Sequence, residues 1–167
     1  ANPKIFYNPI KNILSVLIPL EGTIKMHLQE YLLKDGYPEL LDIESLITCR
    51  EKLRNYLTLA IYKDIVRIFG VRDPKTLEEL VTLLAGESSQ RREYSNLSNT
   101  LFIKRDTLVK YLNYLERVFL ISRAEFHSKS RALRIRKTKK IYLTNIGLRN
   151  VLARTLDESL LRDDVEL

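Results

Sequence analysis

The fold is decided by residues 94–116, YSNLSNTLFIKRDTLVKYLNYLE. On each side of a short break at Phe102-Ile103, apolar residues recur at spacings of three and four, as they do along one face of an α-helix. Two short helices of this kind, joined by a few residues, form a helix-turn-helix. We expect the second helix to begin at Lys104 or Arg105. The inward residues are Leu97 and Leu101 in the first helix and Leu108, Tyr111, Leu112 and Leu115 in the second.

Beyond the second helix the sequence takes on the character of β-structure. Residues 118–126 are rich in strand-forming types, and residues 128–130 have the composition of a turn. Apolar and basic residues then alternate over residues 133–136, and the same two-residue period returns at Ile141 and Leu143. A helix-turn-helix followed by a basic hairpin is the order of a winged helix.

The first part of the chain has a helical pattern. Asn8-Pro9 predicts the start of a helix that stops before Pro19, and a second helix is expected over residues 23–34. Asp35-Gly36 is expected to end that helix, because glycine readily takes the left-handed conformation found at helix ends.

A longer periodic segment covers residues 45–69 and stops at Gly70, after which Asp73-Pro74 opens another helix. A last helix is expected over residues 145–161. The predicted inward residues are Leu53, Leu57, Ala60, Ile61, Ile65 and Ile68 in the long helix and Leu77, Leu80, Val81 and Leu84 in the next. We therefore predict a mainly α fold with a small β-hairpin, in which a helical region (1–88) precedes a winged helix-turn-helix (89–154) and a C-terminal helix or tail (155–167).

The charge of the chain is unevenly distributed. The 167 residues carry a formal net charge of +7, but residues 101–154 alone hold 14 basic and three acidic residues, a local charge of +11. Such asymmetry favours an anionic partner, most often nucleic acid. A solvated basic face is the alternative, because net charge bears on association and not on fold.

A helix-turn-helix binds duplex DNA by laying the solvent face of its second helix in the major groove. Lys, Arg and Asn carry the donors that contact base edges and phosphates, and a basic hairpin adds further contacts. The candidate DNA-binding residues are Lys104, Arg105, Thr107, Lys110 and Asn113 on the helix and Lys129, Arg131, Arg134, Arg136, Lys137, Lys139 and Lys140 on the hairpin.

The sequence contains no recognisable motif for nucleotide binding, metal binding or catalysis. The five glycines include no pair with the spacing of a phosphate-binding loop and no Gly-x-Gly. His27 and His127 lie far apart, and the lone Cys49 is expected to be a buried, inert thiol. We predict no catalytic residue, metal or cofactor in this chain. Glu39, Asp42 and Glu44 are expected to be surface charges or helix caps.

No segment reaches the roughly 20 apolar residues of a membrane span, since the run over residues 13–20 is interrupted by Ser15 and Pro19. No signal peptide is evident, and residue 1 is Ala. We therefore expect a cytoplasmic protein without membrane contact that forms part of a longer polypeptide.

Four segments together resemble a known arrangement. Residues 31–39 (YLLKDGYPE) are similar to a Tyr-Leu-x-x-Gly-Gly-x-Pro-Glu box, and residues 62–65 (YKDI) to a helix ending in Lys-Asp-Ile/Val. Residues 107–116 (TLVKYLNYLE) resemble a recognition-helix signature, Thr-Val-x-x-Tyr-Leu-x-x-Leu-Glu, and residues 139–148 (KKIYLTNIGL) a Lys-x-Tyr-Phe-x-Asp-x-Gly-Leu segment.

These boxes are found in the region that follows the P-loop module of archaeal and bacterial AAA-type ATPases. The resemblance covers residues 24–152 and implies a C-terminal winged-helix portion of such an enzyme. Asp35 stands where the first Gly of the pair is usual, and Asn145 where Asp is common. ATP and Mg²⁺ would belong to the upstream module of the same polypeptide and not to this chain.

Three functions are consistent with these patterns. The first is a winged-helix module that binds double-stranded DNA and regulates an AAA-type ATPase. The second is a protein-docking module that packs on its own ATPase core or on a partner, without DNA contact. The third is a stand-alone transcription regulator, which we rank lowest because two leading helices and a Gly-x-Pro-Glu turn are unusual in a small regulator.

Overall fold

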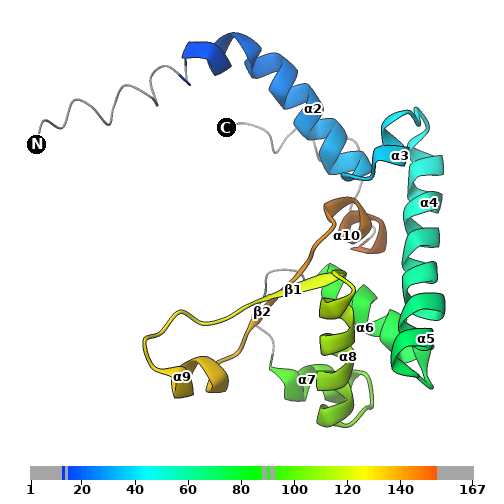
Figure 1. Ribbon diagram of the computed structural model, residues 1–167, viewed down its shortest axis with the longest axis vertical. Helices are drawn as coiled ribbons and strands as arrows, with labels where there is room; N and C mark the ends of the chain where they lie inside the picture. The colour runs from blue at the N-terminus through cyan, green and yellow to red at the C-terminus, as the bar shows by residue number, and fades with distance from the viewer. Residues whose placement is uncertain (1–12, 14, 88–89, 91–92, 154–167) are drawn as a thin grey trace, which may run out of the picture.

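The computed structural model describes residues 13, 15–87, 90 and 93–153. Figure 1 shows a body of packed helices from which helix α2 and a β-hairpin project in different directions. The predicted fold class is confirmed, since the described chain is mainly helical and carries a two-stranded antiparallel hairpin near its C-terminal end. The elements are η2 (Ile18–Leu20), α2 (Glu21–Lys34), α3 (Pro38–Leu41), α4 (Leu46–Thr58), η3 (Leu59–Ile65), α5 (Val66–Phe69), α6 (Pro74–Gly86), α7 (Tyr94–Thr100), α8 (Arg105–Arg117), β1 (Ile121–Ala124), α9 (Arg131–Arg136), β2 (Lys140–Leu143) and α10 (Ile146–Ala153).

We call the described residues 13 and 15–34 the N-terminal arm. The sequence predicted that a helix stops before Pro19, but the helical structure of the arm continues past this residue. Pro19 lies inside the 3₁₀ turn η2, and α2 follows directly, two residues before the expected start. Proline is tolerated there because the first turn of a helix leaves its N–H groups unpaired in any case. The predicted helix start at Asn8-Pro9 lies outside the described residues.

At the end of α2, the prediction was wrong about which residue has a positive φ. Asp35, and not Gly36, has a positive φ of 71°, and its side chain is only 2% exposed. The Asp35 carboxylate accepts hydrogen bonds from the N–H of Gly36 at 2.7 Å and from the N–H of Leu148 in α10 at 3.4 Å. A second link joins the same helices, because Asn150 Nδ2 donates to the carbonyl of Leu32 at 3.1 Å. These bonds anchor the arm to the C-terminal helix.

The predicted long helix over residues 45–69 is confirmed as the continuous run α4–η3–α5. Ser45 caps its start, and Gly70, with φ 63°, ends it in the left-handed conformation. The middle segment η3 is a π-helix. Ile68 was expected to point inward but is 62% exposed, whereas the neighbouring Val66 and Phe69 are partly buried against the core.

The spacing of the buried residues accounts for the π-helix. Four side chains recur strictly every fourth residue, and in an α-helix each such step overshoots a full turn by about 40°. The wider turns of a π-helix bring that spacing back towards one face. The four buried residues are Leu53, Leu57, Ile61 and Ile65.

The hairpin has the predicted strands but not the predicted connection. Strand β1 pairs antiparallel with β2, with Ile121 opposite Leu143 and Ala124 opposite Lys140. Residues 133–136, predicted as strand, lie in the helix α9, which Ser130 caps through a hydrogen bond from the N–H of Leu133 at 3.4 Å. Arg, Ala and Leu are strong helix formers, and an alternation of four residues is too short to outweigh them.

One hydrophobic core runs through the described chain. Buried side chains from Leu40 in α3 to Val151 in α10 form a single cluster, to which the long helix, α6, α8 and both strands contribute. The predicted inward residues of α6 and α8 are all buried there. Helix α6 packs against both β2 and α10, so the core continues across the predicted boundary at residue 88.

Candidate nucleic-acid interface

Helix α8 is held with one face in the core. Its apolar residues are buried as predicted, and the hydroxyl of Tyr111 donates to the carbonyl of Asp73 at 3.3 Å. Asp73 itself caps α6 by accepting from the N–H of Thr76 at 3.1 Å. The second helix of the helix-turn-helix is therefore fixed to the start of α6, and its opposite face is directed towards solvent.

Three of the predicted basic residues are exposed at the N-cap and in the first two turns of α8. Lys104, Arg105 and Lys110 are exposed, and no ion pair engages them within the described part of the chain. Thr107, predicted to point outward, is half-buried. Exposed cations without an internal ion pair are suited to phosphate contacts, because no internal partner has to be displaced first.

Asn113 is exposed as predicted but is engaged with the hairpin. Its side-chain oxygen accepts a hydrogen bond from Arg123 Nη2 of β1 at 2.8 Å. Arg123 Nε also donates to Glu116 Oε2 at 3.0 Å, and this bond lowers the pKa of Glu116 below its usual value. The same contact raises the pKa of Arg123, which stays charged. Arg123 thus joins the hairpin to α8, a role that the sequence reasoning missed.

The hairpin residues fall into three groups. Lys129, Arg131 and Lys137 are exposed, and no described residue forms an ion pair with them. Lys139 is half-buried and pairs with Glu125 at 2.9 Å, and Lys140 is half-buried in β2. The remaining two residues, Arg134 and Arg136, lie on α9, and their side chains are outside what the structure describes.

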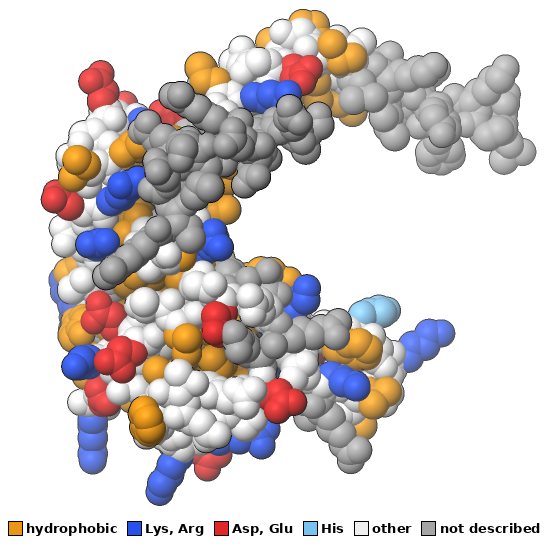
Figure 2. Space-filling model, turned by 180° about the vertical axis from the view of Figure 1, so that it is seen from behind, with side chains coloured by type: hydrophobic (Ala, Val, Ile, Leu, Met, Phe, Trp, Pro, Cys, Tyr) orange, Lys and Arg blue, Asp and Glu red, His pale blue; other side chains and the backbone are white. Residues whose placement is uncertain are grey.

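The predicted residues form two cationic groups on different elements. Figure 1 places α8 in the body and α9 at the outer end of the hairpin. Figure 2 shows Lys and Arg side chains projecting along the lower edge of the molecule and again at the tip of the hairpin, with acidic side chains between them on the body. A single partner that contacted both groups would have to be an extended polyanion.

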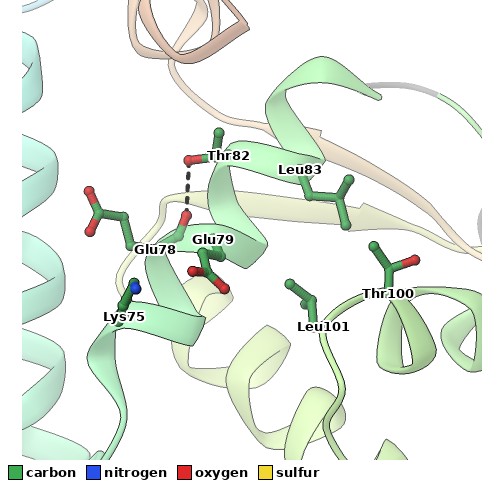
Figure 3. Close-up of a pocket in the computed structure, with 7 residues that line it drawn as sticks. All are labelled: Lys75, Glu78, Glu79, Thr82, Leu83, Thr100 and Leu101. Carbon is green, nitrogen blue, oxygen red and sulfur yellow. Dashed lines mark hydrogen bonds between the residues drawn. The ribbon is translucent and has the colours of Figure 1, made fainter.

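One cavity lies elsewhere. A groove of about 430 Å³ separates α6 from the end of α7 and is lined by Lys75, Glu78, Glu79, Thr82, Leu83, Thr100 and Leu101. Figure 3 shows Glu78 directed away from Leu101, and its carboxylate accepts the hydroxyl of Tyr62 at 2.6 Å. That bond raises the pKa of Tyr62. The lining offers carboxylates and one amine but no nucleophile beside a base.

Two other side chains considered for catalysis, Cys49 and Glu39, make contacts within the fold. Cys49 is buried, as expected, and its thiol faces the carbonyl of Ile43 at 3.8 Å. Glu39 forms an ion pair with Lys52 and accepts the hydroxyl of Tyr56. These bonds lower the pKa of Glu39, and the hydrogen bond that Tyr56 donates to Glu39 raises the pKa of Tyr56 to about 12.

The described residues contain no group of three or more His, Cys, Asp or Glu side chains placed to hold a metal ion. None of their helices is long and apolar enough to cross a membrane.

Comparison with known proteins assigns the chain to a family. Neither the curated proteins nor the solved structures gave a match. A family model described as a domain of unknown function, DUF8612, matches residues 25–159, which include every element from α2 to α10 except the first turn of α2. The chain therefore belongs to the DUF8612 family.

Proposed function

We propose that this chain is a winged-helix module that binds double-stranded DNA. The observation that carries the proposal is the set of exposed cations at the start of α8 and in its second turn, Lys104, Arg105 and Lys110. They lie in the segment of the chain that holds a local charge of +11. The exposed Lys129, Arg131 and Lys137 of the hairpin supply a second set of phosphate contacts.

The test is a titration of fluorescent duplex DNA with the wild-type chain and with an Arg105→Ala/Lys110→Ala variant at about 50 and about 200 mM salt. With about six phosphate contacts, the logarithm of the affinity should fall with the logarithm of salt at a slope of about −5. Removing two of these contacts should reduce the slope by about two.

An Arg54→Ala/Lys63→Ala variant is the matched control. Both residues are exposed on the long helix, and the variant loses the same two charges. Its salt slope should stay close to that of the wild type. Binding that does not respond to salt, or that weakens equally in both variants, would contradict a DNA interface on α8.

Protein docking is the second candidate, and the N-terminal arm is the observation that favours it. Helix α2, all of whose residues are described, has no buried residue. Monomeric proteins rarely leave so many apolar side chains in solvent. The exposed large apolar residues of the arm are Ile13, Val16, Leu17, Ile18, Leu20, Ile24, Met26, Leu28 and Tyr31.

The docking candidate can be tested by hydrogen exchange. If the arm packs on the ATPase module of the same polypeptide, its amides should exchange more slowly in the full-length gene product than in the 167-residue chain. Equal exchange in the two proteins would count against docking through this arm, and the DNA titration above is independent of the result.

We further propose that the parent protein is a cytoplasmic AAA-type ATPase. The resemblance of the four boxes to the region that follows the P-loop module of such enzymes supports this. The first and the fourth box also meet in space, through Asp35 and Leu148. The gene sequence upstream of this segment tests the proposal. A Gly-x-x-x-x-Gly-Lys-Thr motif there would support it, and an upstream region without any nucleotide-binding motif would exclude it.

A further inference from the structure

Both helices of the helix-turn-helix end in the same backbone arrangement. After α7, the N–H of Phe102 bonds the carbonyl of Asn99 and the N–H of Ile103 bonds that of Ser98, at 3.2 and 3.0 Å. After α8, Phe119 and Leu120 repeat this pattern with Glu116 and Leu115, at 3.1 and 3.0 Å. These paired bonds define a Schellman motif, and each phenylalanine occupies its left-handed position, with φ values of 53° and 60°.

Neither folding nor packing accounts for phenylalanine at these positions. Glycine is the usual residue there, because a side chain in the left-handed conformation is strained by about 1–2 kcal/mol. Burial gives no compensation, since Phe102 is 96% and Phe119 78% exposed. At Phe102, which is almost fully solvated and stands two residues before the N-cap of α8, the strain is best explained by a partner that covers the ring.

The neighbours of Phe102 indicate what that partner is. Phe102 lies in the turn just before α8, next to the exposed, unpaired Lys104 and Arg105. In a helix-turn-helix, the first residues of the second helix are those that reach base edges in the major groove. An apolar side chain at this place contacts the C5-methyl group of thymine, the one apolar feature of the groove.

We infer that Phe102 is a base contact that recognises the thymine methyl group in the major groove. The inference rests on the proposed DNA-binding function and adds a preferred base to it. An apolar protein surface is less favoured, because two exposed cations, Lys104 and Arg105, follow Phe102 by two and three residues.

Phe119 provides an internal comparison. It has the same backbone motif and a similar strain, but it follows the last turn of α8, about 20 Å from the first. Its neighbour Arg117 is directed onto the ring of Phe69, with 5.2 Å between the guanidinium carbon and the ring centroid. Substitution of Phe119 therefore controls for the backbone effect without changing the start of α8.

The experiment compares alternating dA·dT and dA·dU DNA duplexes, which differ only by the thymine methyl group because deoxyuridine replaces thymidine. Binding is measured for the wild type and for Phe102→Gly, Phe102→Asn and Phe119→Gly, with unfolding in urea measured in parallel. Asparagine also tolerates the left-handed conformation, so it controls for the added flexibility of glycine.

The wild type and Phe119→Gly should bind the A·T duplex about fourfold more tightly, the value for one buried methyl-sized group. Both Phe102 variants should bind the two duplexes equally, and both glycine variants should unfold at higher urea concentration. The inference is overturned if the wild type does not prefer the thymine-containing duplex, or if a Phe102 variant still prefers it. Failure of every protein to bind either duplex overturns the proposed function instead.

Discussion

Phe69, the last residue of α5, stacks on Tyr114 of α8 with ring centroids 4.3 Å apart and planes inclined by only 10°. The stack joins the end of the long helix to the middle of the second helix of the helix-turn-helix. Aromatic pairs contribute about 0.5–1.5 kcal/mol beyond the area they bury. The candidate recognition helix is therefore held from its flank by an element that precedes it by several tens of residues.

A double-mutant cycle with Phe69→Leu and Tyr114→Leu should measure this coupling. Leucine keeps an apolar side chain at both places but removes the stacking, so each single variant should be less stable than the wild type. The coupling energy from urea unfolding is expected to be about 0.5–1.5 kcal/mol. Strictly additive losses would mean that the two rings do not stabilise each other.

Replacement of Asp35 should test the link between the arm and α10. Asp35→Ala leaves the buried N–H of Leu148 without its acceptor, which should lower the free energy of unfolding by about 1–3 kcal/mol. Asp35→Asn is the matched control, because its amide oxygen can still accept the bond and its loss should be smaller. If both variants unfold at the same urea concentration as the wild type, the bond does not contribute to stability.

Gly147 is expected to tolerate no side chain. A Cβ added there would lie 2.6 Å from the Cβ of Asp35, so Gly147→Ala must displace the end of α2 from α10. We expect a loss of about 1–3 kcal/mol by thermal unfolding. Gly86→Ala, at a helical position with nothing within 4 Å of the added atom, should instead be neutral or raise the stability.

The pair formed by Glu116 and Arg123 should make stability depend on pH. The hydrogen bond from Arg123 holds the pKa of Glu116 below the usual 4.5, so protonation favours the unfolded chain. The contribution of Glu116 is therefore present above about pH 4.5 and is lost as the pH falls through the lower, folded-state pKa. Urea unfolding should show the wild type more stable than Glu116→Gln near neutral pH, with the difference shrinking in acid.

Glu79→Gln serves as the comparison for that series, because Glu79 is exposed and no described residue forms an ion pair with it. Its stability relative to the wild type should change little over the same pH range. A difference for Glu116→Gln that grows towards low pH would contradict the assigned direction of the shift.

The parts of the fold that follow from local patterns could be predicted. Helices α6 and α8 have regular apolar spacing with a cap or a turn at each end, and their buried residues were identified correctly. Gly70 ended the long helix as expected, because glycine is the residue that the left-handed position favours. The exposure of Lys104, Arg105 and Lys110 followed from the same periodicity.

The rest depended on contacts between distant segments. Asp35 takes a backbone conformation in which glycine is usual, and the bond to Leu148, which no local pattern indicates, helps to hold it there. Arg123 was counted only as part of the basic segment, although Glu116 seven residues earlier was a signal for their pair. Phe102 was assigned to a turn, and its exposure became evident only from the three-dimensional arrangement.

The single core has a practical consequence for isolating the winged helix. Helix α6 packs against both β2 and α10. A fragment that begins near residue 88 would lack α6, so Ile141 of β2 and Leu148 of α10 would be exposed to water. Such a fragment should aggregate or be digested by proteases, and the two parts should melt together in one cooperative transition. Biochemical tests of the proposed DNA interface are therefore best done with the preceding helices attached.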